Sequence, residues 1–100
     1  MTNSPESITS CLHTIVEGRV QGVGFRYFVL AKAQQMNITG WVRNTHKGDV
    51  EVMAEGDREE LEELLSALRK GPRSAFVTNI QENWETPSGD FQNFAVRSTY

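Results

Sequence analysis

The chain has 100 residues, of which 38% are hydrophobic and 23% are charged, and its formal net charge is −3. This length and composition are typical of one globular domain, and no apolar run approaches the ~20 residues that a helix needs to cross a bilayer. The acidic balance argues against nucleic acid as a general partner, because binding to a phosphate backbone requires a basic surface.

Residues 1–9 are mostly polar and predict a flexible tail, which leaves residues 10–100 as a single domain. The tail lacks the basic residues, apolar stretch and small-residue cleavage site of a signal peptide, so we expect a cytoplasmic protein. Residues 11–20 are rich in β-branched and apolar side chains and predict a first strand. The single cysteine, Cys11, falls in this strand as a small buried residue and has no partner for an internal disulfide.

Three glycines and a terminal arginine mark the segment at the end of this strand, Gly18-Arg19-Val20-Gln21-Gly22-Val23-Gly24-Phe25-Arg26. Glycine lets backbone N–H groups turn toward a ligand without interference from a side chain, and a run of such groups forms a concave site for an anion. The start of the next helix adds unpaired N–H groups, and Arg26 offers a planar charged fork that matches phosphate oxygens. We therefore predict a phosphate-binding loop formed by Val20, Gln21, Gly22, Val23, Gly24, Phe25 and Arg26.

Residues 25–37 predict a helix, because apolar side chains recur at helical spacing along one face and Asn37 is suited to end it. Residues 38–45 and 49–55 predict two strands joined by a tight turn that contains Gly48. Apolar and polar residues alternate in the second of these strands, which predicts one buried face and one mostly solvated face.

Residues 57–70 predict a second helix, in which Asp57 is suited as the N-cap and Glu60 completes a capping-box pattern. Residues 76–84 predict a fourth strand, and residues 91–96 predict a short last strand. The order strand, helix, strand, strand, helix, strand is the split β-α-β arrangement. We therefore predict an α+β fold, a ferredoxin-like βαββαβ sandwich with two helices on one face of a mostly antiparallel sheet and a short extra C-terminal strand.

This topology brings two polar residues together. The first two strands of a split β-α-β arrangement run in the same direction, so their C-terminal ends lie at one edge of the sheet. The first strand ends at the glycine loop and the second ends near Asn44, so we expect Arg26 and Asn44 to lie close together. The Asn44 amide can orient a water but cannot act as a base at neutral pH. Because no general acid is evident, the pair suits phosphoryl transfer from a substrate with a good leaving group.

Two segments resemble the signatures of the acylphosphatase family. The first is Val16-x-Gly18-x-Val20-Gln21-Gly22-Val23-x-Phe25-Arg26, and the second is Gly40-Trp41-Val42-Arg43-Asn44-x-x-x-Gly48-x-Val50, followed by Gly56. The resemblance extends over residues 11–96. It implies hydrolysis of acyl phosphates, which are carboxylic–phosphoric anhydrides, to a carboxylate and inorganic phosphate. It also implies that Arg26 binds the phosphate and Asn44 orients the attacking water, with no metal and no cofactor.

Other functions stay open at this point. The loop also suits a domain that binds phosphate or a similar anion without turnover. Acylphosphatase-like domains occur, too, in larger maturation proteins that handle carbamoyl phosphate, of which this chain can be a fragment. An RNA-binding ferredoxin-like module is disfavoured, because such a module needs paired aromatics and a basic surface on its sheet, and residues 49–55 are acidic. We expect a monomer that acts on a small acyl phosphate and has no nucleic-acid or membrane partner.

Overall fold

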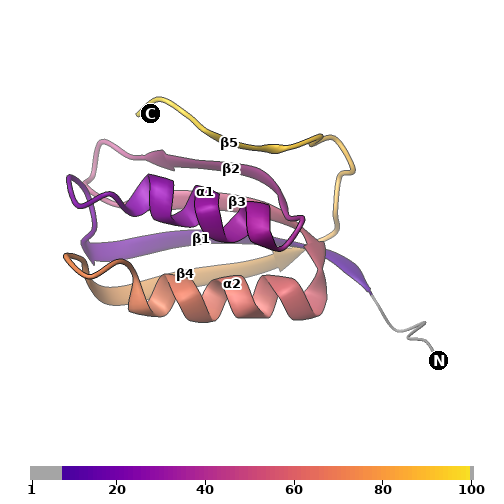
Figure 1. The fold of residues 1–100 in the computed structure, drawn as a ribbon, viewed down its shortest axis with the longest axis horizontal. Coiled ribbons are helices and arrows are strands. Elements are labelled where there is room, and N and C mark those ends of the chain that lie inside the picture. Colours follow the sequence, from indigo (N-terminus) through magenta and orange to yellow (C-terminus); the bar gives the residue numbers. More distant parts are fainter. Residues whose placement is uncertain (1–7, 100) are drawn as a thin grey trace.

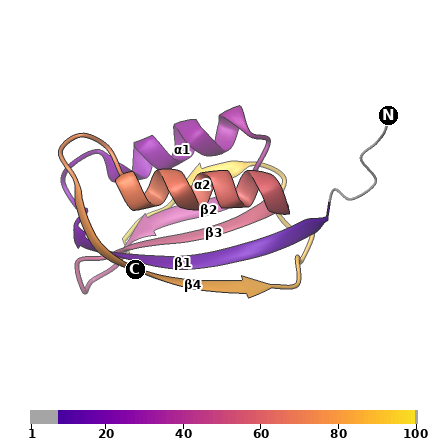
Figure 2. The ribbon, with the colours of Figure 1, turned by 90° about the horizontal axis from the view of Figure 1, so that it is seen from below.

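The structure, a computed structural model, describes residues 8–99. Its elements in chain order are β1 (Thr9–Arg19), α1 (Phe25–Gln35), β2 (Thr39–Asn44), β3 (Val50–Asp57), α2 (Arg58–Lys70), β4 (Phe76–Glu85) and β5 (Phe94–Val96). The strands form one sheet in the order β4-β1-β3-β2-β5, and both helices lie against one of its faces (Figure 1 and Figure 2). The predicted ferredoxin-like sandwich with an added C-terminal strand is confirmed.

The hydrophobic core fills the space between the sheet and the two helices. The apolar stripe of α1 is buried through Phe25, Val29 and Ala33. Four leucines of α2 are buried at the spacing that predicted this helix, namely Leu61, Leu64, Leu65 and Leu68. Burying a leucine side chain stabilises the fold by about 1.5–3 kcal/mol, so these faces hold the helices on the sheet. Neither helix within residues 8–99 is long and apolar enough to cross a membrane.

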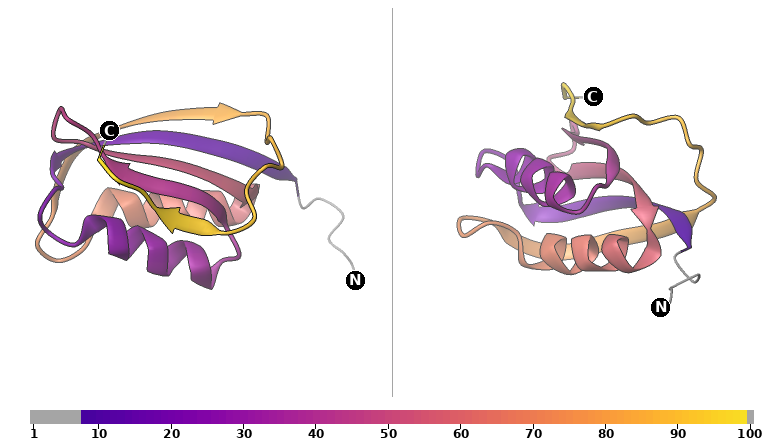
Figure 3. Two further views of the ribbon diagram at one scale, coloured as in Figure 1. Left: turned by 90° about the horizontal axis from the view of Figure 1, so that it is seen from above. Right: turned by 45° about the vertical axis from the view of Figure 1, so that its right-hand side comes forward.

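Strand directions place two connections at the same end of the sheet. Strand β3 pairs antiparallel with β1 on one side and with β2 on the other, so β1 and β2 are parallel to each other. The loop after β1 and the turn after β2 therefore emerge together, at the left in Figure 1 and in the left panel of Figure 3. Strand β5 pairs parallel with β2 and is shorter than the predicted residues 91–96.

The N-terminal boundary and the start of α2 differ from the sequence prediction. The predicted tail, residues 1–9, lies outside the described residues except for Ile8 and Thr9. Thr9 is already the first residue of β1, where it pairs with Asp57. Asp57 is the N-cap of α2, but its side chain makes no capping hydrogen bond, so the capping box predicted with Glu60 is not formed. Because Asp57 also ends β3, its extended backbone belongs to the strand ladder as well as to the helix start.

The sheet face away from the helices is less solvated than the alternation in β3 predicts. Glu55 is only 6% exposed, because the segment between β4 and β5 folds over it. The Ser88 N–H and hydroxyl donate to Oε2 of Glu55 at 2.7 and 2.9 Å, and the Gly89 N–H donates to Oε1 at 3.0 Å. Burial raises the pKa of Glu55, but these hydrogen bonds outweigh it and hold the pKa below its ordinary value of 4.5. The prediction of a solvated face is wrong at this position.

Candidate functional site

A cavity of about 190 Å³ lies where the loop after β1, the start of α1 and the end of β2 meet. It is lined by Val20, Gly22, Gly24, Phe25, Arg26, Tyr27 and Asn44. Arg26 and Asn44 therefore contribute to one cavity, as the strand topology predicts. Its volume corresponds to roughly six waters at ~30 Å³ each, which is room for a phosphoryl group and an attacking water.

Glycine conformation shapes the loop side of this cavity. Gly22 and Gly24 have φ angles of 75° and 79°, which are left-handed values that side-chain-bearing residues disfavour. A Cβ built on either glycine meets nothing within 4 Å, so conformation rather than crowding requires glycine here. Gly24 is the N-cap of α1 and provides no side-chain hydrogen bond to its first turn. That end of the helix can therefore bind an anion through its N–H groups.

Arg26 is held at the cavity by a backbone acceptor from the other end of the chain. A cation in the first turn of a helix is unfavourable in the field of the helix dipole unless an anion or acceptor balances it. The Nη1 group of Arg26 donates to the carbonyl of Arg97 at 3.4 Å. Arg97 is itself fixed, because its N–H donates to the Val42 carbonyl at 2.8 Å and its guanidinium lies 5.1 Å from the Trp41 ring centre. Sequence reasoning missed this contact, since no motif marks Arg97.

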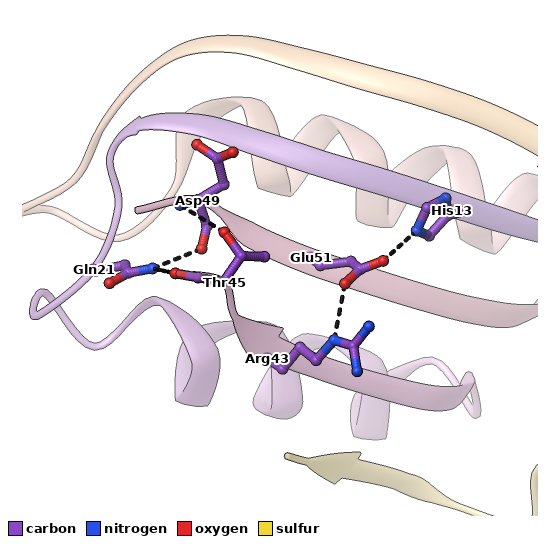
Figure 4. A network of polar contacts seen from close by, with 6 residues as sticks. All are labelled: His13, Gln21, Arg43, Thr45, Asp49 and Glu51. Carbon is purple, nitrogen blue, oxygen red and sulfur yellow. Dashed lines mark hydrogen bonds and ion pairs between the residues drawn. The ribbon is translucent and has the colours of Figure 1, made fainter. Parts of the chain in front are cut away.

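Asn44 is delivered to the cavity by its position at the end of β2. The preceding residue, Arg43, lies on the opposite face of the strand. Arg43 donates from Nε to Oε1 of Glu51 at 2.8 Å and lies 4.4 Å from the Trp41 ring centre. Oε2 of Glu51 in turn lies 2.7 Å from Nε2 of His13 (Figure 4). Burial raises the pKa of Glu51, but its hydrogen bonds to His13 and Arg43 outweigh burial, so the net pKa is lowered.

Two residues of the predicted phosphate loop do not line the cavity. The Gln21 amide nitrogen donates to the carbonyls of Thr45 and Asp49, each at 2.8 Å, and Figure 4 shows the side chain reaching toward the turn after β2. The Val23 side chain packs against the hydrophobic core. The roles predicted for the backbone N–H groups of these two residues stay predictions.

A larger cavity of about 400 Å³ lies beside the turn between β2 and β3. It is lined by Ile15, Thr45, His46, Lys47, Asp49 and Gln81. Its two basic side chains, His46 and Lys47, lie on an exposed part of the turn. The negative charge of the Asp49 carboxylate would repel an anion in this cavity. The smaller cavity is therefore the better candidate for a phosphate site. Among residues 8–99, no three His, Cys, Asp or Glu side chains gather closely enough to hold a metal ion.

Comparison with known proteins identifies the family of this chain. The model of the acylphosphatase family matches residues 12–96. A curated acylphosphatase of Syntrophotalea carbinolica is 49% identical over 82 residues, which cover 82% of this chain and 89% of the relative. The chain belongs to the acylphosphatase family.

Solved structures share the fold of this acylphosphatase-family chain. The crystal structure of acylphosphatase from Bacillus subtilis aligns with a TM-score of 0.85 and 36% identity, over 90% of this chain and 99% of that one. Full-length HypF, in its phosphate- and nucleotide-bound form, aligns with a TM-score of 0.83 and 26% identity. That alignment covers 92% of this chain but 12% of HypF, so the acylphosphatase fold also occurs as a small part of a much longer chain.

Proposed function

We propose that this protein hydrolyses acyl phosphates to a carboxylate and inorganic phosphate, with Arg26 as the phosphate-binding side chain and Asn44 as the residue that orients water. The observation that carries the proposal is the single cavity to which both side chains contribute, beside Gly22 and Gly24. Membership of the acylphosphatase family supports the substrate class. The proposal assigns no metal and no cofactor to the site.

The cavity suits a reaction that needs positioning and charge stabilisation more than proton transfer by the protein. The loop N–H groups, the end of α1 and Arg26 hold the phosphoryl oxygens. A water on the Asn44 amide attacks phosphorus opposite the acyl oxygen, and the bond from phosphorus to that oxygen breaks with its electrons on the leaving carboxylate. One proton of the water stays on its oxygen, which becomes part of the phosphate, and the other passes to a phosphoryl oxygen. The products are therefore a carboxylate and dihydrogen phosphate. A carboxylate leaves readily without a general acid.

Hydrolysis of benzoyl phosphate in the presence of a chelator tests the proposal. We expect wild-type turnover, and we expect Asn44→Ala to lower kcat about 100-fold or more while inorganic phosphate still inhibits. Arg26→Ala removes the charged donor, so it should raise both KM and the inhibition constant of phosphate. Asn83→Ala and Arg73→Ala are matched controls at exposed positions and should behave as wild type. If benzoyl phosphate disappeared at the uncatalysed rate in the presence of the wild-type protein, the proposed enzymatic activity would be ruled out.

The same assay separates the other two functions. A phosphate-binding domain without catalysis would bind inorganic phosphate, lose this binding in Arg26→Ala, and leave benzoyl phosphate intact. The alignment with 12% of HypF supports only the part of the second alternative that places this fold within a longer chain. That alternative is a fragment of a larger protein that handles carbamoyl phosphate. Faster turnover of carbamoyl phosphate than of benzoyl phosphate would favour that alternative. Action as a cytoplasmic monomer stays a prediction, which sedimentation and cell fractionation test.

A further inference from the structure

The Gln21 side chain connects the phosphate loop to the turn that follows Asn44. Its amide nitrogen carries two hydrogens, and both are used: one bonds to the Thr45 carbonyl and one to the Asp49 carbonyl, each at 2.8 Å (Figure 4). Gln21 follows Val20 directly in the loop, and Thr45 follows Asn44 directly in the chain. One side chain thus ties together the two segments that line the cavity.

The turn does not need Gln21 in order to close. The Thr45 N–H donates to the Asp49 carbonyl at 2.9 Å, and the Gly48 N–H donates to the Thr45 carbonyl at 3.1 Å. The Asp49 N–H donates to the Thr45 hydroxyl oxygen at 3.2 Å. Each carbonyl that Gln21 reaches therefore already has a donor from within the turn. What the Gln21 amide adds is a link between the turn and the loop.

The sheet provides no such link at this end. Strand β1 pairs with β3 only as far as Val16, which lies opposite Val50. Val50 is also the partner of Asn44 in β2, so these three residues form the last row across the three strands. Strand β1 also pairs with β4 from Cys11 to Arg19, so beyond that row its end pairs with β4 alone. The phosphate loop thus follows the β1–β4 strand pair, whereas the turn after β2 joins the β2–β3 strand pair.

We infer that Gln21 is a positioning residue for hydrolysis, which fixes the Asn44 amide at the right distance from the phosphate loop. The inference rests on the proposed function. A misplacement of about 1 Å between a bound group and its attacking partner can cost on the order of 100-fold in rate. The link therefore acts on the water that Asn44 orients, whereas Arg26 and the helix end hold the phosphate independently of it.

Gln21→Met and Gln21→Glu test the link. Methionine nearly matches glutamine in shape and has no donor, and glutamate places an oxygen against two carbonyl oxygens. We expect kcat for benzoyl phosphate to fall about tenfold or more in both variants, with the inhibition constant of inorganic phosphate within about threefold of wild type. Gln35→Met and Gln35→Glu, at an exposed position of α1, are the matched controls. Circular dichroism and urea unfolding report whether each variant folds.

A double-mutant cycle with Asn44→Ala distinguishes positioning from a general effect on the fold. If Gln21 acts through Asn44, adding Gln21→Met to Asn44→Ala should change kcat less than about twofold. The inference would be overturned if Gln21→Met lowered kcat by the same factor in the wild-type and Asn44→Ala backgrounds. It would also be overturned if Gln21→Met and Gln21→Glu both kept the wild-type kcat, or if neither variant folded. A wild-type protein that does not hydrolyse benzoyl phosphate would refute the proposed function, and the inference with it. Active wild type with active Gln21 variants would refute the inference alone.

Discussion

Glu55→Gln is expected to lower the free energy of unfolding by about 2–3 kcal/mol at neutral pH, because the loss from one broken and two weakened hydrogen bonds exceeds what the neutral amide saves in the cost of burying a charge. The Glu55 carboxylate accepts three hydrogen bonds from Ser88 and Gly89, and these bonds hold the segment between β4 and β5 against the sheet. A hydrogen bond to a charged group contributes about 1.5–3 kcal/mol, and one between neutral groups about 0.5–1.5 kcal/mol. The glutamine oxygen can keep the two Ser88 donors in weaker form. Its NH₂ group then faces the Gly89 N–H, and that bond is lost.

The effect depends on pH with a defined sign. Because the folded-state pKa of Glu55 is held below its ordinary value of 4.5, its contribution to stability is fully present above that value. The contribution is lost as the pH falls through the folded-state pKa, where the carboxyl takes up a proton. The difference between wild type and Glu55→Gln should therefore shrink in acid, since a protonated carboxyl also carries a hydrogen donor.

Urea unfolding of both proteins, at neutral pH and in acid, measures this difference. Glu63→Gln removes the same charge from an exposed position of α2 and is the control, with an expected change within about 0.5 kcal/mol. A Glu55→Gln protein as stable as wild type at neutral pH would refute the reasoning. So would a difference that stays constant as the pH falls, because the contribution would then not come from the carboxylate.

The remaining predictions concern stability, accessibility and ligand binding. Gly40→Ala should cost about 3 kcal/mol or more in urea unfolding, because its Cβ would lie 1.9 Å from the Met53 carbonyl oxygen at a φ of 133°; a near-neutral change would contradict the close approach. Thr14→Val should raise the free energy of unfolding by about 1 kcal/mol, because the buried Thr14 hydroxyl has no hydrogen-bond partner among residues 8–99; a loss of stability would contradict this. Cys11 should resist thiol reagents at mildly alkaline pH until the protein unfolds, because burial, and then the negative charges of Glu55 and Glu85, raise its pKa to about 11; rapid labelling of the native protein would contradict this. Inorganic phosphate at 100 times its Kd should stabilise wild type by about 2.7 kcal/mol but should not stabilise Arg26→Ala at that concentration.

The sequence alone predicted the elements and the glycine loop, because the signals involved are local. Helical spacing of leucines predicted α2, and the alternation of residues 49–55 predicted the buried face of β3. Glycines before a helix predicted a loop whose backbone can approach a ligand, and the structure gives Gly22 and Gly24 left-handed φ angles there. The order of the elements was then enough to bring Arg26 and Asn44 to one cavity, because a split β-α-β arrangement places parallel strand ends together.

The tertiary structure alone decided which side chains hold these segments in place. The link from Gln21 to the turn, the burial of Glu55 by Ser88, and the acceptor that Arg97 offers to Arg26 all join residues far apart in the chain. Their partners are backbone groups or exposed polar residues, which carry no periodicity and no motif. Such contacts depend on strand register and on the course of a loop, and both are fixed only when the whole sheet is assembled.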